Sequence, residues 1–224
     1  MLIYSQDQLK IYRIPDGPLQ TNSYWIDTGT TSCLIDPILN PENRPSNVSR
    51  LSLVVATHGH FDHIGRCDDW RAIHPVKMAI HSAEGSALTD PAINCSILLG
   101  EGLEFYPAEI ELHDQQIIQL DAQVQLQVIH TPGHTPGGIC LLVLYNGQPQ
   151  VLLTGDTLFA GSVGRVDIGG NENQLMQSLD RLIKVSEIYG RDLMILPGHG
   201  PETTMTEELK SNPWLSGRAR AKSS

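Results

Sequence analysis

Residues 54–63 read VVATHGHFDH, a short apolar run that leads directly into three histidines and one aspartate. The apolar segment from Leu51 to Ala56 predicts a buried strand. The loop after this strand carries His58, His60, Asp62 and His63. Ligand sites gather in such loops at strand ends in open α/β sheets. The first two histidines can face one way while the last two residues, at the start of a predicted helix, face another, so this one segment can serve two metal ions.

Three later apolar runs end in the same kinds of residue. The run 128–129 leads through HTPG to His134, the run 152–154 leads to Asp156, and the run 195–196 leads to His199. A further run, 34–35, ends in Asp36 without a histidine. Neutral imidazole and carboxylate are ligands that zinc and similar divalent metals accept, and two adjacent ions need about six or seven of them. We therefore predict a dinuclear metal site built from His58, His60, Asp62, His63, His134, Asp156 and His199.

The length and composition fit one soluble domain. A chain of 224 residues can bury a sizeable core, and its 40% hydrophobic and 18% charged residues are ordinary for globular proteins. We therefore expect a single domain over residues 1–224. No apolar run approaches the roughly 20 residues that span a bilayer. Residues 1–7 form no basic or long apolar signal region, so we expect no membrane association and a cytoplasmic location.

Charge and cysteine usage exclude other classes of protein. The chain has 15 basic and 25 acidic residues, a net charge of -10, which has the wrong sign for binding a phosphate backbone. We therefore expect no nucleic-acid partner. The only basic cluster, from Arg218 to Lys222, predicts a solvated terminus. The four cysteines are scattered without C-x-x-C spacing, and three of them lie in apolar or strand-like contexts that are typical of buried thiols, which argues against disulfides or a cysteine metal site.

The remaining sequence predicts many strands and few helices. Helical spacing appears after His63 as far as Ile73, and most clearly over 172–189, where Asn171 is the expected N-cap and Gly190 the stop. Asn146-Gly147 predicts a hairpin turn. The pattern indicates a layered α/β domain and leaves the topology open. Strands are expected over residues 9–14, 24–27, 33–36, 51–56, 77–81, 117–120, 124–130, 139–145, 151–154 and 193–196.

The order of the candidate ligands resembles the metallo-β-lactamase fold superfamily over nearly the whole chain. The resemblance implies an α/β fold with four layers, an αββα sandwich, with the metals at one edge of two facing sheets. It implies that one ion is held by His58, His60 and His134. The second ion would be held by Asp62, His63 and His199, with Asp156 bridging the two.

Two longer motifs are similar to one group within that superfamily. TPGHTPGG at 131–138 and GDTLFAGSVGR at 155–165 resemble the glyoxalase II group of hydroxyacylglutathione hydrolases. Asn212-Pro213-Trp214 resembles that group's asparagine-proline-aromatic ending more weakly. Full-length glyoxalase II carries a helical domain that binds glutathione beyond the last ligand histidine. Only residues 200–224 follow His199 here, so the resemblance is to the single-domain glyoxalase II-like hydrolases without that C-terminal domain.

The resemblance implies a small thioester substrate and catalysis by water. Two metals about 3.5–4 Å apart lower the pKa of a water between them, which then attacks a carbonyl. Asp62 and Asp156 would be the catalytic carboxylates that orient this water and accept its proton. A leaving thiolate with a pKa near 8.5 needs little help from a general acid. Zinc is the expected metal, with iron and manganese as alternatives because imidazole and carboxylate suit all three.

Several other functions share the same fold. A persulfide dioxygenase would be an oxidoreductase that uses one iron on His58, His134 and Asp156, and that group usually has a cysteine where Ser162-Val163 stands here. A diiron oxygen or nitric-oxide reductase would want glutamate in place of His60. Hydrolysis of a lactone or lactam is open, whereas the charge opposes a nuclease. A non-catalytic binding module is the last alternative, although all the ligand positions are filled.

Four further histidines and one ion pair are not expected to bind metal. His81 and His130 can lie next to the site without ligating a metal. Arg165 and Asp167 are expected to form an ion pair beneath the site. The histidines expected at the surface or in caps are His74 and His113.

Overall fold

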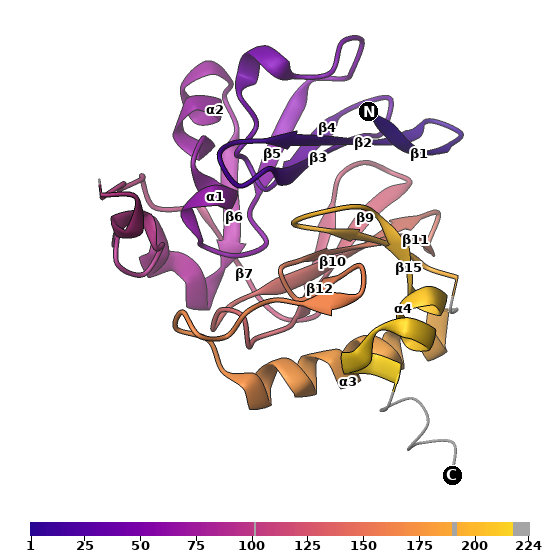
Figure 1. Ribbon diagram of the computed structural model, residues 1–224. Coiled ribbons are helices and arrows are strands. Elements are labelled where there is room, and N and C mark those ends of the chain that lie inside the picture. The colour runs from indigo at the N-terminus through magenta and orange to yellow at the C-terminus, as the bar shows by residue number, and fades with distance from the viewer. Residues whose placement is uncertain (101, 190–191, 217–224) are drawn as a thin grey trace.

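Two β-sheets form the centre of the computed structural model, which describes residues 1–100, 102–189 and 192–216 (Figure 1). The first half of the chain forms a seven-stranded sheet whose strands lie in chain order. Pairing is antiparallel from β1 to β4 and parallel from β4 to β7. The strands are β1 (Leu2–Gln6), β2 (Leu9–Asp16), β3 (Thr21–Asp27), β4 (Ser32–Ile35), β5 (Leu51–Val55), β6 (Lys77–His81) and β7 (Ile110–Leu112).

The second half forms a six-stranded sheet in the order β15-β14-β11-β10-β9-β8. Its pairs are antiparallel except for β11 and β14, which are parallel. The predicted turn joins β10 to β11, since Tyr145 pairs with Gln148 and both turn residues have positive φ. The strands are β8 (Ile117–Gln119), β9 (Val124–His130), β10 (Ile139–Tyr145), β11 (Gln148–Gly155), β14 (Met194–Pro197) and β15 (Thr203–Thr204), and a separate hairpin pairs β12 (Leu158–Phe159) with β13 (Ser162–Val163).

The α-helices of the described residues are α1 (Phe61–Ile64), α2 (Cys67–Ile73), α3 (Glu172–Tyr189) and α4 (Met205–Ser211). The helix predicted after His63 as far as Ile73 is present as two pieces, because the helical conformation is interrupted between α1 and α2. Asn171 caps α3 as predicted, since its Oδ1 accepts from the Gln174 N–H at 3.0 Å. The expected stop at Gly190 and the basic cluster from Arg218 to Lys222 lie outside the described residues. The 3-10 helices are η1 (Pro41–Asn43), η2 (Ser82–Leu88) and η3 (Ser96–Leu99).

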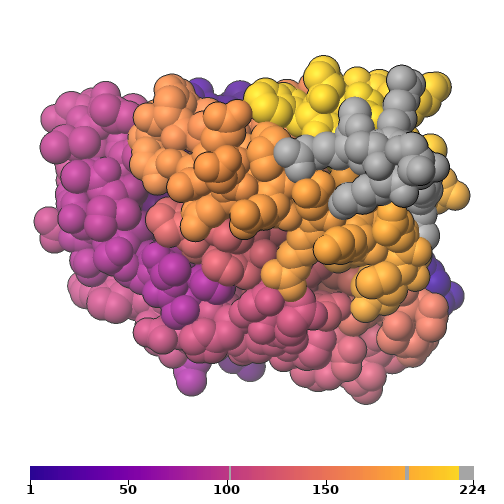
Figure 2. Space-filling view, turned by 90° about the horizontal axis from the view of Figure 1, so that it is seen from below, coloured from indigo at the N-terminus to yellow at the C-terminus, as the bar shows by residue number. Residues whose placement is uncertain are grey.

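The two sheets pack face to face between layers of helices, so the four-layer αββα sandwich is confirmed. One apolar core lies between the sheets and contains Ile26 and Leu141. A second packs Leu142 of the same strand β10 against Leu179 of α3. Because both faces of β10 are buried, its sequence is continuously apolar. On the far side Trp70 of α2 packs on the first sheet. Figure 2 shows the opposite helical layer, with α3 and α4 on the surface.

The predicted strands are all present, with ends that differ by up to three residues. The sequence did not predict β1, β7, β12, β13 or β15. The first of these, LIYSQ, has no fully buried residue, and the others are two or three residues long. All four cysteines are free and buried, whereas burial was expected for three of them. Within the described residues, no helix is long and apolar enough to cross a membrane.

Candidate metal centre

The site lies where strand ends of both sheets meet. β4 ends before Asp36, β5 ends before the loop that holds His58, and β11 and β14 lead to Asp156 and His199. Backbone hydrogen bonds fasten the two sheets together at this edge. The Asn22 N–H donates to Gly198 O at 2.7 Å, and the Ile139 N–H donates to Thr57 O at 2.9 Å. The fold thus brings residues that are far apart in the sequence to one edge of the sandwich.

The seven predicted side chains all converge there and fall into overlapping groups whose donor atoms lie within 4.8 Å of one another. In the first group His60 Nδ1 lies 3.1 Å from His58 Nε2 and 3.0 Å from His134 Nε2. A tetrahedral ion with nitrogen ligands at 2.0–2.1 Å holds them roughly 3.3 Å apart. The spacing of this triad therefore fits one metal ion.

Two histidines of the first triad, His58 and His60, are uncharged at neutral pH. Burial lowers the pKa of His58 well below its usual value, and burial with the neighbouring imidazoles lowers the pKa of His60 to about 4. His134 Nδ1 donates to Arg165 O at 2.7 Å, which leaves a lone pair on the Nε2 that faces the cluster. These imidazoles present lone pairs to a common point, as metal ligands do.

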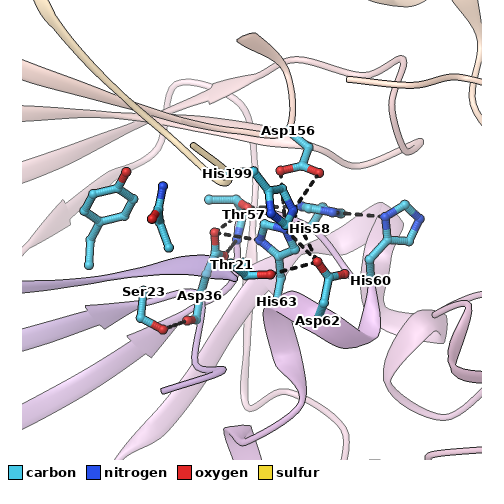
Figure 3. Close-up of polar contacts among 12 residues, drawn as sticks. Thr21, Ser23, Asp36, Thr57, His58, His60, Asp62, His63, Asp156 and His199 are labelled. Carbon is cyan, nitrogen blue, oxygen red and sulfur yellow. Dashed lines mark hydrogen bonds and ion pairs between the residues drawn. The ribbon is translucent and has the colours of Figure 1, made fainter. Parts of the chain in front are cut away.

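The second triad combines two imidazoles with a carboxylate (Figure 3). His199 Nε2 lies 3.2 Å from Asp62 Oδ2 and 3.4 Å from His63 Nε2. Burial acts to lower the pKa of both histidines, but neighbouring carboxylates, Asp156 among them, raise the pKa of each above its usual value. The pKa of Asp62 is lowered in turn, against the effect of burial, by His63 and by hydrogen bonds. This half of the site therefore attracts positive charge.

Asp156 lies between the two triads. Its Oδ1 is 3.3 Å from His63 Nε2, and its Oδ2 is 3.5 Å from both His134 Nε2 and His199 Nε2. The Oδ1 atom is buried and has no hydrogen-bond partner among the described residues. An ionised oxygen buried in this way is costly unless a cation meets it. Gly198 allows the approach, since a Cβ there would lie 2.2 Å from Asp156 Oδ1. The residues present therefore fit a pair of divalent ions.

A layer of hydrogen bonds beneath the cluster orients the candidate ligands. Asp36 Oδ2 lies 2.9 Å from His63 Nδ1 and accepts from the Thr57 hydroxyl, while its Oδ1 accepts from the Thr57 N–H at 2.7 Å. The Thr21 hydroxyl donates to Asp62 Oδ2 at 2.9 Å. Such outer partners fix the tautomer and direction of a ligand. The sequence marked Asp36 as a carboxylate at a strand end but gave it no role.

Glu84 is a residue of the site that sequence reasoning missed. Its side chain is buried, with 4% exposed. Oε2 accepts from the Gly59 N–H at 2.8 Å, and Oε1 accepts from the Gly137 N–H at 2.6 Å. One carboxylate therefore joins the loop of His58 to the loop that follows His134. Nothing in the neighbouring sequence signals this role, because both partners are backbone groups of distant loops.

The histidines outside the ligand set have structural contacts instead. His81 accepts from the Ala83 N–H at the start of η2 and stacks on His130, with ring centroids 4.1 Å apart. Burial and the neighbouring His130 and His113 lower the pKa of His81 to about 4. His74 stacks on Trp70. None of these four histidines belongs to the metal-binding groups found among the described residues.

The expected ion pair between Arg165 and Asp167 forms, with two hydrogen bonds of 2.7 and 2.6 Å. It lies exposed at the rim of the site rather than beneath it, since both side chains are more than half exposed. The Arg165 carbonyl accepts the hydrogen bond from His134.

A pocket of about 510 Å³ opens above the cluster. Candidate ligands from both triads line it, among them His60, Asp62 and His199. A second cavity of about 410 Å³ adjoins it and shares His60 in its lining. The arrangement can therefore place the carbonyl of a small substrate directly on the cluster.

A sequence profile of the metallo-β-lactamase superfamily matches residues 16–199. The probable metallo-hydrolase YqgX of Bacillus subtilis strain 168 is 32% identical over 222 residues, which cover 93% of this chain and 99% of YqgX. Hydroxyacylglutathione hydrolase GloC of Haemophilus influenzae is 28% identical over 227 residues, which cover 94% of this chain and 100% of GloC.

Solved structures of similar proteins have the same fold as this chain. BLEG-1, described as a B3 metallo-β-lactamase, superposes with a TM-score of 0.82 at 32% identity, covering 92% of this chain and 100% of its own. TTHA1623 in a di-iron-bound form gives 0.74 at 31% identity, with coverage of 91% and 100%. ETHE1 from Myxococcus xanthus gives 0.72 at 26% identity, with coverage of 92% and 84%. The chain therefore belongs to the metallo-β-lactamase superfamily and is one of its metal-dependent hydrolases.

Proposed function

We propose that this protein is a dinuclear metallohydrolase that cleaves small thioesters. The observation that carries the proposal is the pair of triads that share Asp156 at the base of an open pocket. His58, His60 and His134 would hold one ion, and Asp62, His63 and His199 the other, with Asp156 between them. The di-iron form of TTHA1623 shows that a similar protein accepts iron, so zinc, iron and manganese are all candidates for this site.

Two divalent ions bound here would activate a water and polarise a substrate carbonyl. Asp62 and Asp156 line the base of the pocket, where they can orient the attacking water and accept its proton. Thr21 holds Asp62 in place through the hydrogen bond to Oδ2. The reaction adds water across the thioester, so the acyl group leaves as a carboxylate and the sulfur as a thiol.

A thioester is favoured over other carbonyl compounds for two reasons. Its leaving thiolate has a pKa near 8.5 and departs without a strong general acid. The relative GloC is named as a hydroxyacylglutathione hydrolase, which supports this class of bond. The likeness to BLEG-1 makes a lactam the main competing substrate.

Metal analysis with a hydrolysis panel tests the proposal. The protein, saturated with zinc, iron or manganese and then freed of excess metal, should contain two ions per chain and hydrolyse S-lactoylglutathione and other small thioesters faster than a lactam or a lactone. Rapid lactam cleavage without thioester turnover would overturn the thioesterase assignment.

A single-iron oxidoreductase is the second candidate, and it would use only His58, His134 and Asp156. The structural similarity to ETHE1 supports this alternative. His199→Ala separates the two candidates. It should lower the metal content to one ion and impair hydrolysis if two ions act together, whereas a one-ion enzyme would keep its metal and its activity.

A further inference from the structure

The walls of the pocket above the cluster are apolar. Leu19, Leu98 and Leu99 have 54%, 68% and 55% of their surface exposed. Exposed apolar side chains so close to a polar cluster gain free energy when a ligand covers them. The other apolar residues of the lining are Phe61, Phe159, Val163 and Ile168.

Leu98 and Leu99 are held in this position by a buried anchor. They belong to η3, and Asn94, two residues before this helix begins, is completely buried. The Asn94 side chain donates to Ala87 O and Leu103 O, each at 2.9 Å. The backbone carbonyl of Asn94 accepts from the N–H of Phe61 at 2.8 Å, and Phe61 directly follows the candidate ligand His60. The leucine pair and the metal loop are therefore parts of one connected unit.

The same pocket offers little to an anionic ligand. Within the described part of the chain, Arg165 is the only Lys or Arg that lines it. Its guanidinium already forms an ion pair with Asp167, through Nε and one terminal nitrogen. The protein as a whole carries a net charge of -10. A carboxylate-bearing thiol such as glutathione would find no uncommitted Lys or Arg among these lining residues.

We propose that the preferred substrates are acyl compounds with an uncharged, apolar substituent on the reacting carbonyl, either the acyl chain or the thiol. This substituent lies along Leu19, Leu98 and Leu99 while the carbonyl lies on the metal cluster. The proposal rests on the hydrolase function proposed above. The pocket of about 510 Å³ is within the usual range for ligand sites and is larger than a carbonyl alone requires.

Two substrate series test the preference with the metal-loaded enzyme. The first lengthens a straight acyl chain from acetyl to octanoyl on the neutral thiol N-acetylcysteamine, and the second lengthens an alkyl thiol on a constant acetyl group. We expect kcat/KM to rise about threefold to fourfold per CH2 in one of the series until the pocket is filled. The series that responds identifies the side of the carbonyl that lies on the leucines.

Leu98→Ser should reduce this dependence on chain length. Ile97→Ser is the matched control, since Ile97 lies on the same turn, is 58% exposed and does not line the pocket. It should keep the wild-type dependence. The melting temperature and metal content show whether each variant is folded, and if Leu98→Ser does not fold, the wild-type series decides by itself.

The outcomes separate this inference from the proposed function. If no thioester is hydrolysed by the metal-loaded enzyme, the proposed function fails. If thioesters are hydrolysed but both series are flat, or if S-lactoylglutathione is cleaved better than the lactoyl thioester of N-acetylcysteamine, only the apolar preference is overturned. It is also overturned if sedimentation shows that Leu98→Ser converts a dimer into a monomer while the chain-length dependence is unchanged, because the leucines would then cover a second copy of the chain.

Discussion

Asp36→Asn tests whether the carboxylate beneath His63 sets the tautomer that metal binding requires. Asp36 receives three hydrogens: the Thr57 N–H at Oδ1, and the Thr57 hydroxyl with His63 Nδ1–H at Oδ2. An amide retains only one oxygen. If its NH2 faces His63, the ring must carry its proton on Nε2, which then cannot bind a metal. If the NH2 faces Thr57, a buried backbone N–H loses its acceptor.

Either orientation has a measurable cost. Loss of an outer partner typically weakens metal binding 10–100-fold, or about 1.4–2.7 kcal/mol. An unsatisfied buried donor destabilises the fold by about 1–3 kcal/mol. We therefore expect the affinity of the site formed by Asp62, His63 and His199 to fall at least tenfold, while the His58, His60 and His134 site changes little.

Competition between the metal-free protein and a chelating dye measures both affinities. Asp27→Asn is the matched control: Asp27 is 5% exposed, accepts from backbone N–H groups of Gly29 and Ser49, and lies at the other end of β3 from Thr21. It should cost stability without affecting metal binding. The reasoning is refuted if Asp36→Asn keeps both affinities within twofold, or if Asp27→Asn weakens the second site equally.

Three further changes address the cluster and its surroundings. Asp156→Ala should abolish hydrolysis and weaken binding of both ions, seen by elemental analysis, while circular dichroism stays that of the wild type; retained activity would show that Asp156 does not bridge. Gly198→Ala puts a methyl group 2.2 Å from Asp156 Oδ1 and should cost about 1–3 kcal/mol of stability and much of the metal affinity, whereas Gly85→Ala, with open space around it, should cost neither. The third change concerns His81, whose pKa in the folded protein is about 4, below its usual value. Between about pH 6.5 and 4 the unfolded chain therefore binds a proton at His81 that the folded protein does not bind. The free energy of unfolding falls as the pH falls through that range. His81→Asn keeps a cap for Ala83 but cannot titrate, so its unfolding free energy should fall less than that of the wild type over the same range, and equal losses would count against His81.

The convergence of the candidate ligands could be predicted because each one follows an apolar strand. Ligand sites gather in loops at strand ends, so the pattern predicts that His58, Asp156 and His199 lie close together, and the resemblance to the superfamily implies that they lie at one edge of two facing sheets. The long helix α3 was predictable for a similar reason, since its apolar stripe and cap lie within one segment. These features depend on residues that are close in the sequence.

The features that were not predicted depend on contacts between distant segments. Glu84 matters because two backbone N–H groups, 25 and 53 residues away, point at its carboxylate. The predicted helix is divided at Gly65 and Arg66, where the Arg66 N–H donates to the carbonyl of Pro37, a residue of a distant segment, instead of continuing a helix. Leu98 and Leu99 read as ordinary apolar residues in the sequence, and only the fold shows that they lie at the mouth of the pocket.

The candidate ligands come from both halves of the chain, and His63 lies 136 residues before His199. Neither sheet alone can assemble the second triad, so an ion bound there would act as a removable cross-link that closes a very long loop. A folding chain gains nothing from this link until the two sheets have docked. The ions would therefore change the rate of folding little and slow unfolding strongly, which makes metal supply a control on how long the folded protein survives.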